Sequence, residues 1–198
     1  MEAVIILAVA LLLAYFIGSK KKRRLSPYSN DKVRLGIELI PLSMSFINVR
    51  SRVTEHQWQL LKSHYHNLAG NKCEICGFSG KYKSGKPMLE LHEIWGFFRQ
   101  THKQSLTGMI TLCKHCHMCK HASFHISRGR AETVYEQFKK INGWNEAQTD
   151  YAIAQAKANV KNNDLPWELD LTYLNKHSFL KTTFTNNENK NCTNGARA

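Results

Sequence analysis

The chain has 198 residues, of which 28 are lysine or arginine and 15 are aspartate or glutamate, so its formal net charge is +13. This length accommodates one ordinary domain with attachments. Without residues 1–24 the remainder still has 23 basic and 14 acidic residues. A surplus of that size is typical of proteins that bind a polyanion, most often nucleic acid, although it also fits a surface that only keeps the protein soluble.

The N-terminal segment is an uncharged stretch followed by a basic run. Residues 3–19 carry no charge, and lysines and arginines fill 20–24. The stretch is near the short limit for a bilayer-spanning helix, whereas a cleaved signal peptide carries its cations before its apolar residues. We therefore predict a single-pass transmembrane anchor at 1–19 and a basic juxtamembrane linker at 20–32, with the following domain on the cytoplasmic side. A buried core helix is the alternative.

The first part of the predicted domain combines extended structure with a helix. Residues 33–53 mix short apolar pieces with arginines and are interrupted by Pro41, which favours extended structure. Thr54 and Gln57 have the spacing of a capping box, so we expect a helix to begin there and to end near Gly70. Its apolar face repeats at helical intervals and comprises Trp58, Leu61, Tyr65 and Leu68.

Two C-x-x-C pairs follow, and they predict a structural zinc site. Cys73 and Cys76 form the first pair, and Cys113 and Cys116 form the second. This spacing suits zinc thiolates in a reducing compartment better than a disulfide framework. The site is expected to be closed, because protein supplies all four ligands. Cys119 is expected to be a small buried thiol rather than a fifth ligand.

Three histidines near the second pair predict another metal site, of a different kind. Apolar and polar residues alternate in "MLELHEIW" (88–95), which predicts a strand with His92 on its polar face; "GMITL" (108–112) predicts a second strand. A helix is expected beyond Cys116, with His117 and His121 on one face. Two helical histidines facing a third on a strand form an open site. Alone, His92 would more often be a hydrogen-bonded structural histidine, and His115 is given no ligand role.

The rest of the chain predicts two more helices and a short extended piece. The segment 131–144 predicts a helix that is stopped by Asn142 and Gly143. The next helix is expected to begin at Asn145, which has the spacing of a capping pair with Gln148. Residues 164–171 are expected to form a turn and a short extended piece, and 182–198 a disordered tail. The predicted fold class is α+β, with a small two-strand and helix finger, flanking helices and an N-terminal transmembrane helix.

Residues 70–125 resemble the HNH endonuclease family, whose fold is the ββα-metal finger. The resemblance rests on the combination of the C-x-x-C pair, "LELHEI" (89–94) and "LCKHCHMCKH" (112–121). It implies a nuclease in which one divalent metal binds the scissile phosphate while a neighbouring side chain activates the attacking water. Matched by position, the resemblance implies that His92, His117 and His121 are ligands of the catalytic metal, which is Mg²⁺, Mn²⁺, Ni²⁺ or Zn²⁺.

This chain departs from the family pattern at two positions. Glu93 stands where the general-base histidine normally stands, and Gly108 replaces the asparagine that braces the base. Glu93, as base or additional ligand, and His92 are therefore the expected catalytic residues. A glutamate with an ordinary pKa is a weaker base at neutral pH than imidazole unless burial raises that pKa. Phosphate contacts are expected from Lys114, Lys120, Arg128 and Arg130.

Two functions fit the sequence. The first is a membrane-tethered, metal-dependent endonuclease at the cytoplasmic face that hydrolyses the phosphodiester bonds of DNA, with RNA as the less favoured substrate. The second is a zinc-bound, catalytically weak or inactive HNH-like module that binds nucleic acid or protein. Glu93 and Gly108 motivate the second.

Overall fold

The computed structural model describes residues 33–45, 47–80, 88–161 and 165–185. The chain divides into two compact units, Met1–Val33 and Arg34–Ala198, and nearly all described residues belong to the second. No helix within the described ranges is long and apolar enough to cross a membrane. The predicted anchor at 1–19 and linker at 20–32 lie outside the described residues.

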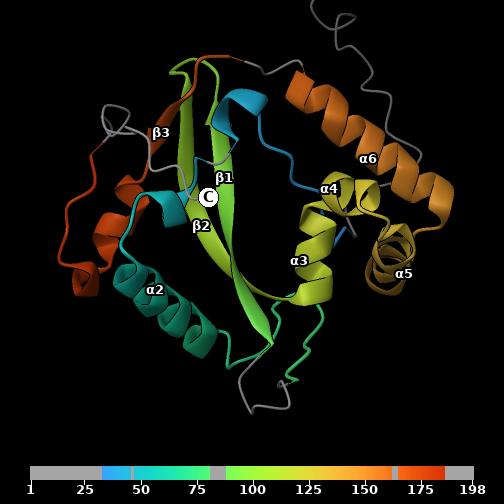
Figure 1. Cartoon of the computed structure of the whole chain (residues 1–198), viewed down its shortest axis with the longest axis horizontal. Helices are drawn as coiled ribbons and strands as arrows, with labels where there is room; N and C mark the ends of the chain where they lie inside the picture. The colour runs from blue at the N-terminus through green and yellow to red at the C-terminus, as the bar shows by residue number, and fades with distance from the viewer. Residues whose placement is uncertain (1–32, 46, 81–87, 162–164, 186–198) are drawn as a thin grey trace, which may run out of the picture. The chain divides into compact units, whose positions relative to one another are not determined.

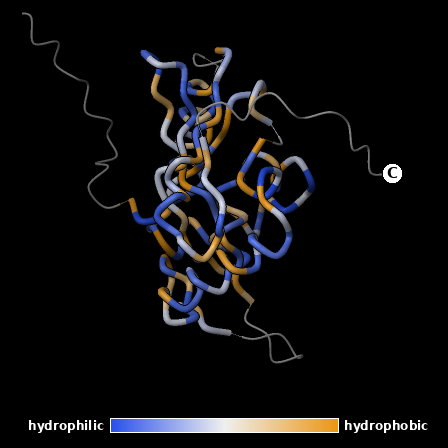
Figure 2. The backbone as a smooth tube through the Cα atoms, turned by 90° about the vertical axis from the view of Figure 1, so that its left-hand side faces the viewer, coloured by the Kyte–Doolittle hydropathy of each residue, from blue (hydrophilic) through white to orange (hydrophobic). Residues whose placement is uncertain are grey.

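The centre of the domain is a long antiparallel hairpin (Figure 1). Strand β1 (Leu89–Phe98) pairs with β2 (Lys103–Cys113), and the register shifts between Ile94 and Trp95. The short strand β3 (Glu168–Asp170) runs parallel to β2 and completes a sheet of order β1-β2-β3. Both predicted strands are present and longer than expected, and the mixed α+β class is confirmed. Figure 2 shows that hydrophobic and hydrophilic residues are interspersed along the described parts of the chain.

Helix α2 (Glu55–Leu68) packs beside the hairpin and begins as predicted. Thr54 and Gln57 form both halves of the capping box. Three of the four expected core residues are buried, but Leu68 is 69% exposed because it ends the helix. Before α2 the prediction of extended structure was incomplete. Two short 3₁₀ helices, η2 (Leu42–Met44) and η3 (Val49–Ser51), interrupt the segment.

Four helices follow the hairpin: α3 (Lys114–Lys120), α4 (Ala122–Ser127), α5 (Ala131–Asn142) and α6 (Glu146–Lys161). Helix α3 begins at Lys114, three residues earlier than the sequence predicted. Gly143 ends α5 in the left-handed conformation, with φ of 71°. Asn145 and Gln148 exchange hydrogen bonds of 2.9 Å, so the cap predicted for α6 is confirmed.

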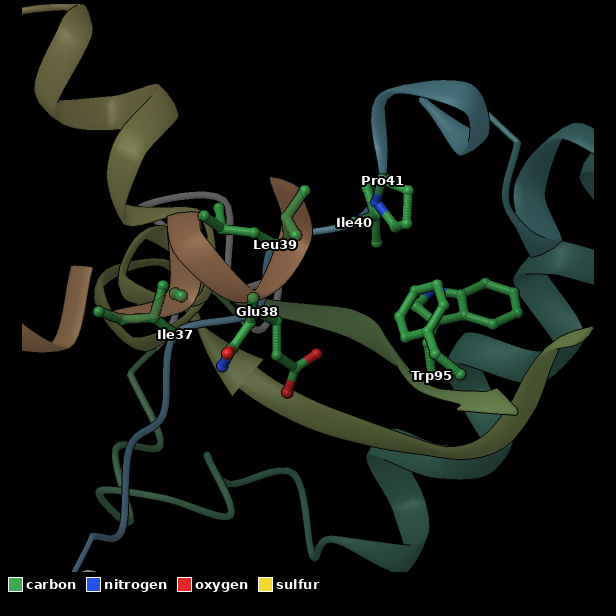
Figure 3. Close-up of a pocket in the computed structure, with 10 residues that line it drawn as sticks. Ile37, Glu38, Leu39, Ile40, Pro41 and Trp95 are labelled. Atoms are coloured by element: carbon green, nitrogen blue, oxygen red, sulfur yellow. The ribbon is translucent and has the colours of Figure 1, made fainter. Parts of the chain in front are cut away.

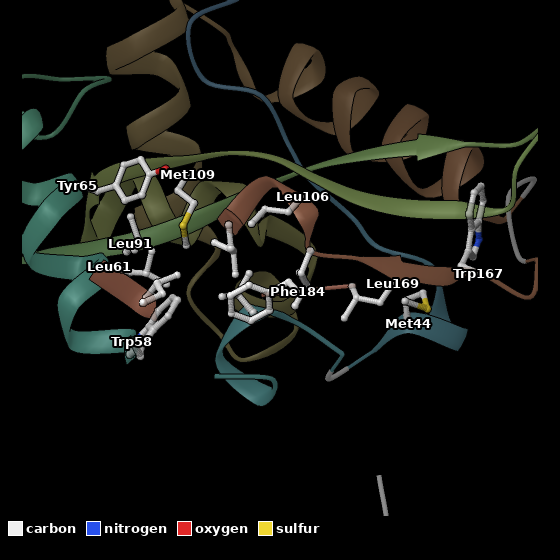
Figure 4. Packing of buried hydrophobic residues seen from close by; sticks show 14 residues of the cluster. Met44, Trp58, Leu61, Tyr65, Leu91, Leu106, Met109, Trp167, Leu169 and Phe184 are labelled. Carbon is white, nitrogen blue, oxygen red and sulfur yellow. The ribbon is translucent and has the colours of Figure 1, made fainter. Parts of the chain in front are cut away.

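Two apolar clusters hold these elements against the hairpin. The first joins α2, the strands, and the 3₁₀ helices η4 (Thr172–Lys176) and η5 (Ser178–Leu180), as Figure 4 shows in part. The second joins the end of the hairpin to α3, α5 and α6. Phe184 is buried in the first cluster, and Asn175 hydrogen-bonds its backbone. The tail predicted from 182 therefore starts too early, while 186–198 lie outside the described residues.

Candidate metal centres

The four predicted zinc ligands converge where the hairpin meets α3. One ligand atom from each of Cys73, Cys76, Cys113 and Cys116 lies within 4.8 Å of the others. Cys113 ends β2 and is the N-cap of α3, and its sulfur accepts a hydrogen bond from the backbone of Cys116. Hydrogen bonding from Cys113 and Cys116 holds the pKa of Cys73 far below its ordinary value. A four-thiol group of this size can hold a tetrahedral metal ion.

Helix α5 packs against the four-cysteine group and against Cys119, which lies beside that group on α3. The Nε2 of Gln137 donates to the sulfur of Cys116 at 3.1 Å. Cys119 is fully buried and its sulfur donates to the carbonyl of Val134. Burial raises the pKa of the Cys119 thiol to about 12. Cys119 therefore packs as a small buried thiol, as its sequence position indicated, and is not in the ligand group.

The three predicted metal-binding histidines form a second group. His92 lies on β1, His117 on α3, and His121 at the junction of α3 and α4. One ring nitrogen from each lies within 4.8 Å of the other two, and the ring centroids are 4.9 to 5.1 Å apart. Three imidazole nitrogens at such separations fit one zinc, nickel or similar divalent ion.

Two carboxylates hydrogen-bond these histidine rings. The Nε2 of His92 lies 2.9 Å from a carboxylate oxygen of Glu38, and the Nδ1 of His117 pairs with Glu90. Carboxylate partners of this kind commonly orient metal-binding histidines. Glu90 lies two residues before His92, so strand alternation placed both on one face. Glu38 was missed, because nothing in the sequence connects residues 54 positions apart.

The protonation of the group suits metal binding. Burial lowers the pKa of His92, and it lowers the pKa of His121 to about 4. Both rings are therefore neutral at pH 7, which is the form that binds a metal. Burial acts to raise the pKa of Glu38, but the hydrogen bond from His92 and the charge of Lys120 outweigh it and give a pKa of about 2.

The histidine group opens into a cavity of about 870 Å³. All three histidines line it, and the other lining residues include Trp58, Lys62, Arg50 and the half-exposed Phe124. The site is therefore accessible, unlike the closed four-cysteine group. Lys62 and Arg50 are the basic side chains of this lining, and Arg50 also pairs with the exposed Glu55 at 3.6 Å. The sequence pattern had not indicated either of them.

Glu93 lies in the same cavity but outside the ligand group of the described residues. Its Oε1 accepts a hydrogen bond of 2.8 Å from the backbone of Val49. Burial raises the pKa of Glu93 to about 7, although hydrogen bonds from Val49, Arg50 and Trp95 act to lower it. A glutamate with a raised pKa is a stronger base at neutral pH than one with an ordinary pKa.

Gly108 lies opposite the strand position that follows Glu93. It pairs with Ile94 at the point where the register shifts. A Cβ at Gly108 would meet the Cδ1 of Ile94 at 3.3 Å. An asparagine in this backbone would therefore require Ile94 to move.

The four predicted phosphate contacts do not gather at the histidines. Lys120 is buried and its ammonium pairs with Glu38 at 2.5 Å, so it is occupied within the protein. Lys114 and Arg130 line a separate cavity of about 450 Å³, together with His115. Arg128 stacks over the ring of Phe124 at 4.6 Å. Glu38 and Phe124, the partners of Lys120 and Arg128, both line the histidine cavity.

No protein-family model, curated protein or solved structure matches the chain. The assignment of both groups therefore rests on their own geometry.

Proposed function

We propose that the protein is a metal-dependent endonuclease of the HNH type that hydrolyses phosphodiester bonds in DNA. The single observation that carries the proposal is the group of three histidines from a strand and a helix, open to a cavity with basic side chains. The four-cysteine group is assigned to a structural Zn²⁺, because four thiolates in a closed tetrahedron are typical of structural zinc.

The second metal is assigned to the histidines. A set of three imidazoles favours Zn²⁺ or Ni²⁺ over Mn²⁺ and Mg²⁺, which prefer oxygen ligands. His92, His117 and His121 would hold such an ion, and it would supply Lewis-acid stabilisation of the negative charge on the phosphate and on the departing oxygen.

The side chains around the histidines supply the remaining parts of the reaction. Glu93 accepts a proton from the attacking water, and its contact with the backbone of Val49 holds the carboxylate in the cavity. Lys62 and Arg50 neutralise phosphate charge in the same cavity. The basic balance of the whole chain favours the same substrate class.

Plasmid cleavage by the full-length chain tests this proposal. With added Mn²⁺, Ni²⁺ or Zn²⁺ the protein is expected to nick supercoiled DNA, and His92→Ala is expected to abolish nicking. His115→Ala is the matched control. His115 is an exposed histidine of α3, the helix that also carries His117, but it lines another cavity. Metal-dependent cleavage that survives in His92→Ala would reject this assignment of the site.

A second candidate function is a nucleic-acid-binding module without turnover. The observation that favours it is that Glu93 is engaged by the backbone of η3 and by Trp95, and so is committed to protein contacts. Glu93→Gln distinguishes the two candidates, because it retains an acceptor for η3 but cannot take a proton. A nuclease is expected to lose about 10²- to 10⁴-fold in rate. A binding module is expected to show salt-sensitive DNA binding that the substitution leaves unchanged.

The membrane location is a further part of the proposal. The apolar residues 3–19 and the cations that follow support a location of the domain at the cytoplasmic face of a membrane. Deleting 1–19 is expected to release the protein from membranes without changing its cleavage of DNA in solution. Retention of the deleted form in the membrane fraction would contradict the anchor.

A further inference from the structure

We propose that Glu38 is a positioning residue of the three-histidine site, which orients His92 so that its Nδ1 is the nitrogen left for the metal. This inference rests on the proposed metal site. It assigns to that site a segment that lies outside the predicted core at 70–125.

The segment that carries Glu38 is anchored at Glu38 itself and at the residues that precede it. The backbone N–H of Glu38 donates to the carbonyl of Lys120 at 2.9 Å. Earlier in the segment, the side chain of Asn142 bonds the backbone of Arg34 and Leu35, and Leu35 is fully buried. Figure 3 shows that the side chains of Glu38 and Leu39 point to opposite sides of the segment. The backbone from which the Glu38 carboxylate extends is therefore held in place.

Both carboxylate oxygens of Glu38 have a partner at the site. Oε2 lies 2.9 Å from the Nε2 of His92, and Oε1 lies 2.5 Å from the ammonium of Lys120. His92 and Lys120 are both buried. A buried carboxylate is costly unless it is paired and hydrogen-bonded. Lys120 supplies the pairing charge, so that Glu38 remains an ionised acceptor for the N–H of His92.

His92 and His117 are bonded to their carboxylate partners through different ring nitrogens. Glu38 bonds the Nε2 of His92, whereas Glu90 pairs with the Nδ1 of His117. Each carboxylate leaves one ring nitrogen for a metal: Nδ1 in His92 and Nε2 in His117. A histidine whose second nitrogen is bonded to a carboxylate has a defined tautomer and orientation, and loss of such a partner typically weakens metal binding 10- to 100-fold.

Metal titration of the full-length chain tests this role. The Kd for Zn²⁺ at the histidine site is measured by competition with a chelator, and native mass spectrometry counts the metals bound. Glu38→Gln is expected to raise that Kd about 10- to 100-fold while the four-cysteine zinc stays bound. Glu38→Asp is expected to recover part of the loss. Glu136→Gln, at an exposed position of α5, is the matched control and is expected to change nothing.

The outcomes separate this inference from the proposed function. If the wild-type chain binds a second metal and Glu38→Gln binds it equally well, the role of Glu38 is wrong and the metal site stands. If the wild-type chain binds no second metal, the proposed function and this inference are both overturned.

A second measurement covers the case in which Glu38→Gln does not fold. The ¹⁵N chemical shifts of the imidazoles in the zinc-loaded wild-type chain show which nitrogen of each ring binds the metal. Coordination through Nδ1 of His92 and Nε2 of His117 is expected. Coordination of His92 through Nε2 would overturn the inference, since that nitrogen would then have left Glu38.

Discussion

His177 is a buried histidine that contacts helix α2. Its Nε2 lies 3.0 Å from the hydroxyl of Tyr65, and the rings of His64, Tyr173 and Phe179 surround it. Burial, with the nearby charges of His64 and Lys176, lowers the pKa of His177 to about 4. The fold therefore accommodates the neutral ring, and the contact with Tyr65 links η4 and η5 to α2.

The lowered pKa of His177 predicts that stability decreases in acid. In the unfolded chain the ring takes up a proton near pH 6.5, whereas in the folded chain it does so only near 4. The contribution to stability is therefore complete above about pH 6.5 and is lost as the pH falls toward 4. Urea unfolding of metal-saturated protein at pH 7 and pH 5 measures it. His177→Phe is expected to reduce the difference between the two pH values, whereas His56→Gln, at an exposed histidine, is not. An unchanged difference in His177→Phe would assign the effect to other groups.

Among the helices, α5 connects the four-cysteine group to the rest of the domain. Its residues Val134 and Phe138 are fully buried, and Gln137 contacts the sulfur of Cys116. The helix ends at Gly143, whose left-handed backbone lets the chain turn into α6. The end of α5 therefore depends on a conformation that glycine adopts without cost.

Gly143→Ala is expected to destabilise the domain by about 1 kcal/mol. A Cβ at Gly143 would meet no atom within 4 Å, so the cost comes from the positive φ alone. Gly36→Ala is a matched control, because that position is equally open but has no positive φ. The free energy of unfolding of both variants, measured in urea, tests this. Equal effects of the two substitutions would contradict the conformational explanation.

At the scale of the whole domain, the two apolar clusters depend on metal to different extents. Cys73, Cys113 and Cys116 are members of the cluster that contains α5, whereas the cluster around α2 contains no cysteine. A structural zinc contributes directly to folding where its ligands come from separate segments. The α2 side, by contrast, has a large apolar cluster of its own.

Removal of zinc is therefore expected to loosen one half of the domain first. After chelation, hydrogen exchange in α3 and α5 is expected to accelerate more than in α2, as measured by mass spectrometry. Cys76→Ser is expected to give the same pattern without a chelator. A uniform loss of protection would show instead that the two clusters unfold together.

The sequence alone was sufficient for the features that depend on local spacing. The capping residues Thr54 and Asn145, the stop at Gly143 and the alternation around His92 each follow from interactions between residues a few positions apart. The C-x-x-C spacing indicated the four thiols for the same reason, and the fold brings them together. The histidine set followed from helical and strand periodicity joined to a motif resemblance.

The tertiary structure decided what lies around those residues. Glu38 reaches His92, and Lys120 pairs with Glu38 instead of remaining free for phosphate. Lys62 lines the histidine cavity although the motif gives no sign of it. These contacts join segments far apart in sequence, so no local period or spacing encodes them. The residues that bind a metal could be found from local patterns, whereas the partners that orient and charge the site come from the packing of the whole chain.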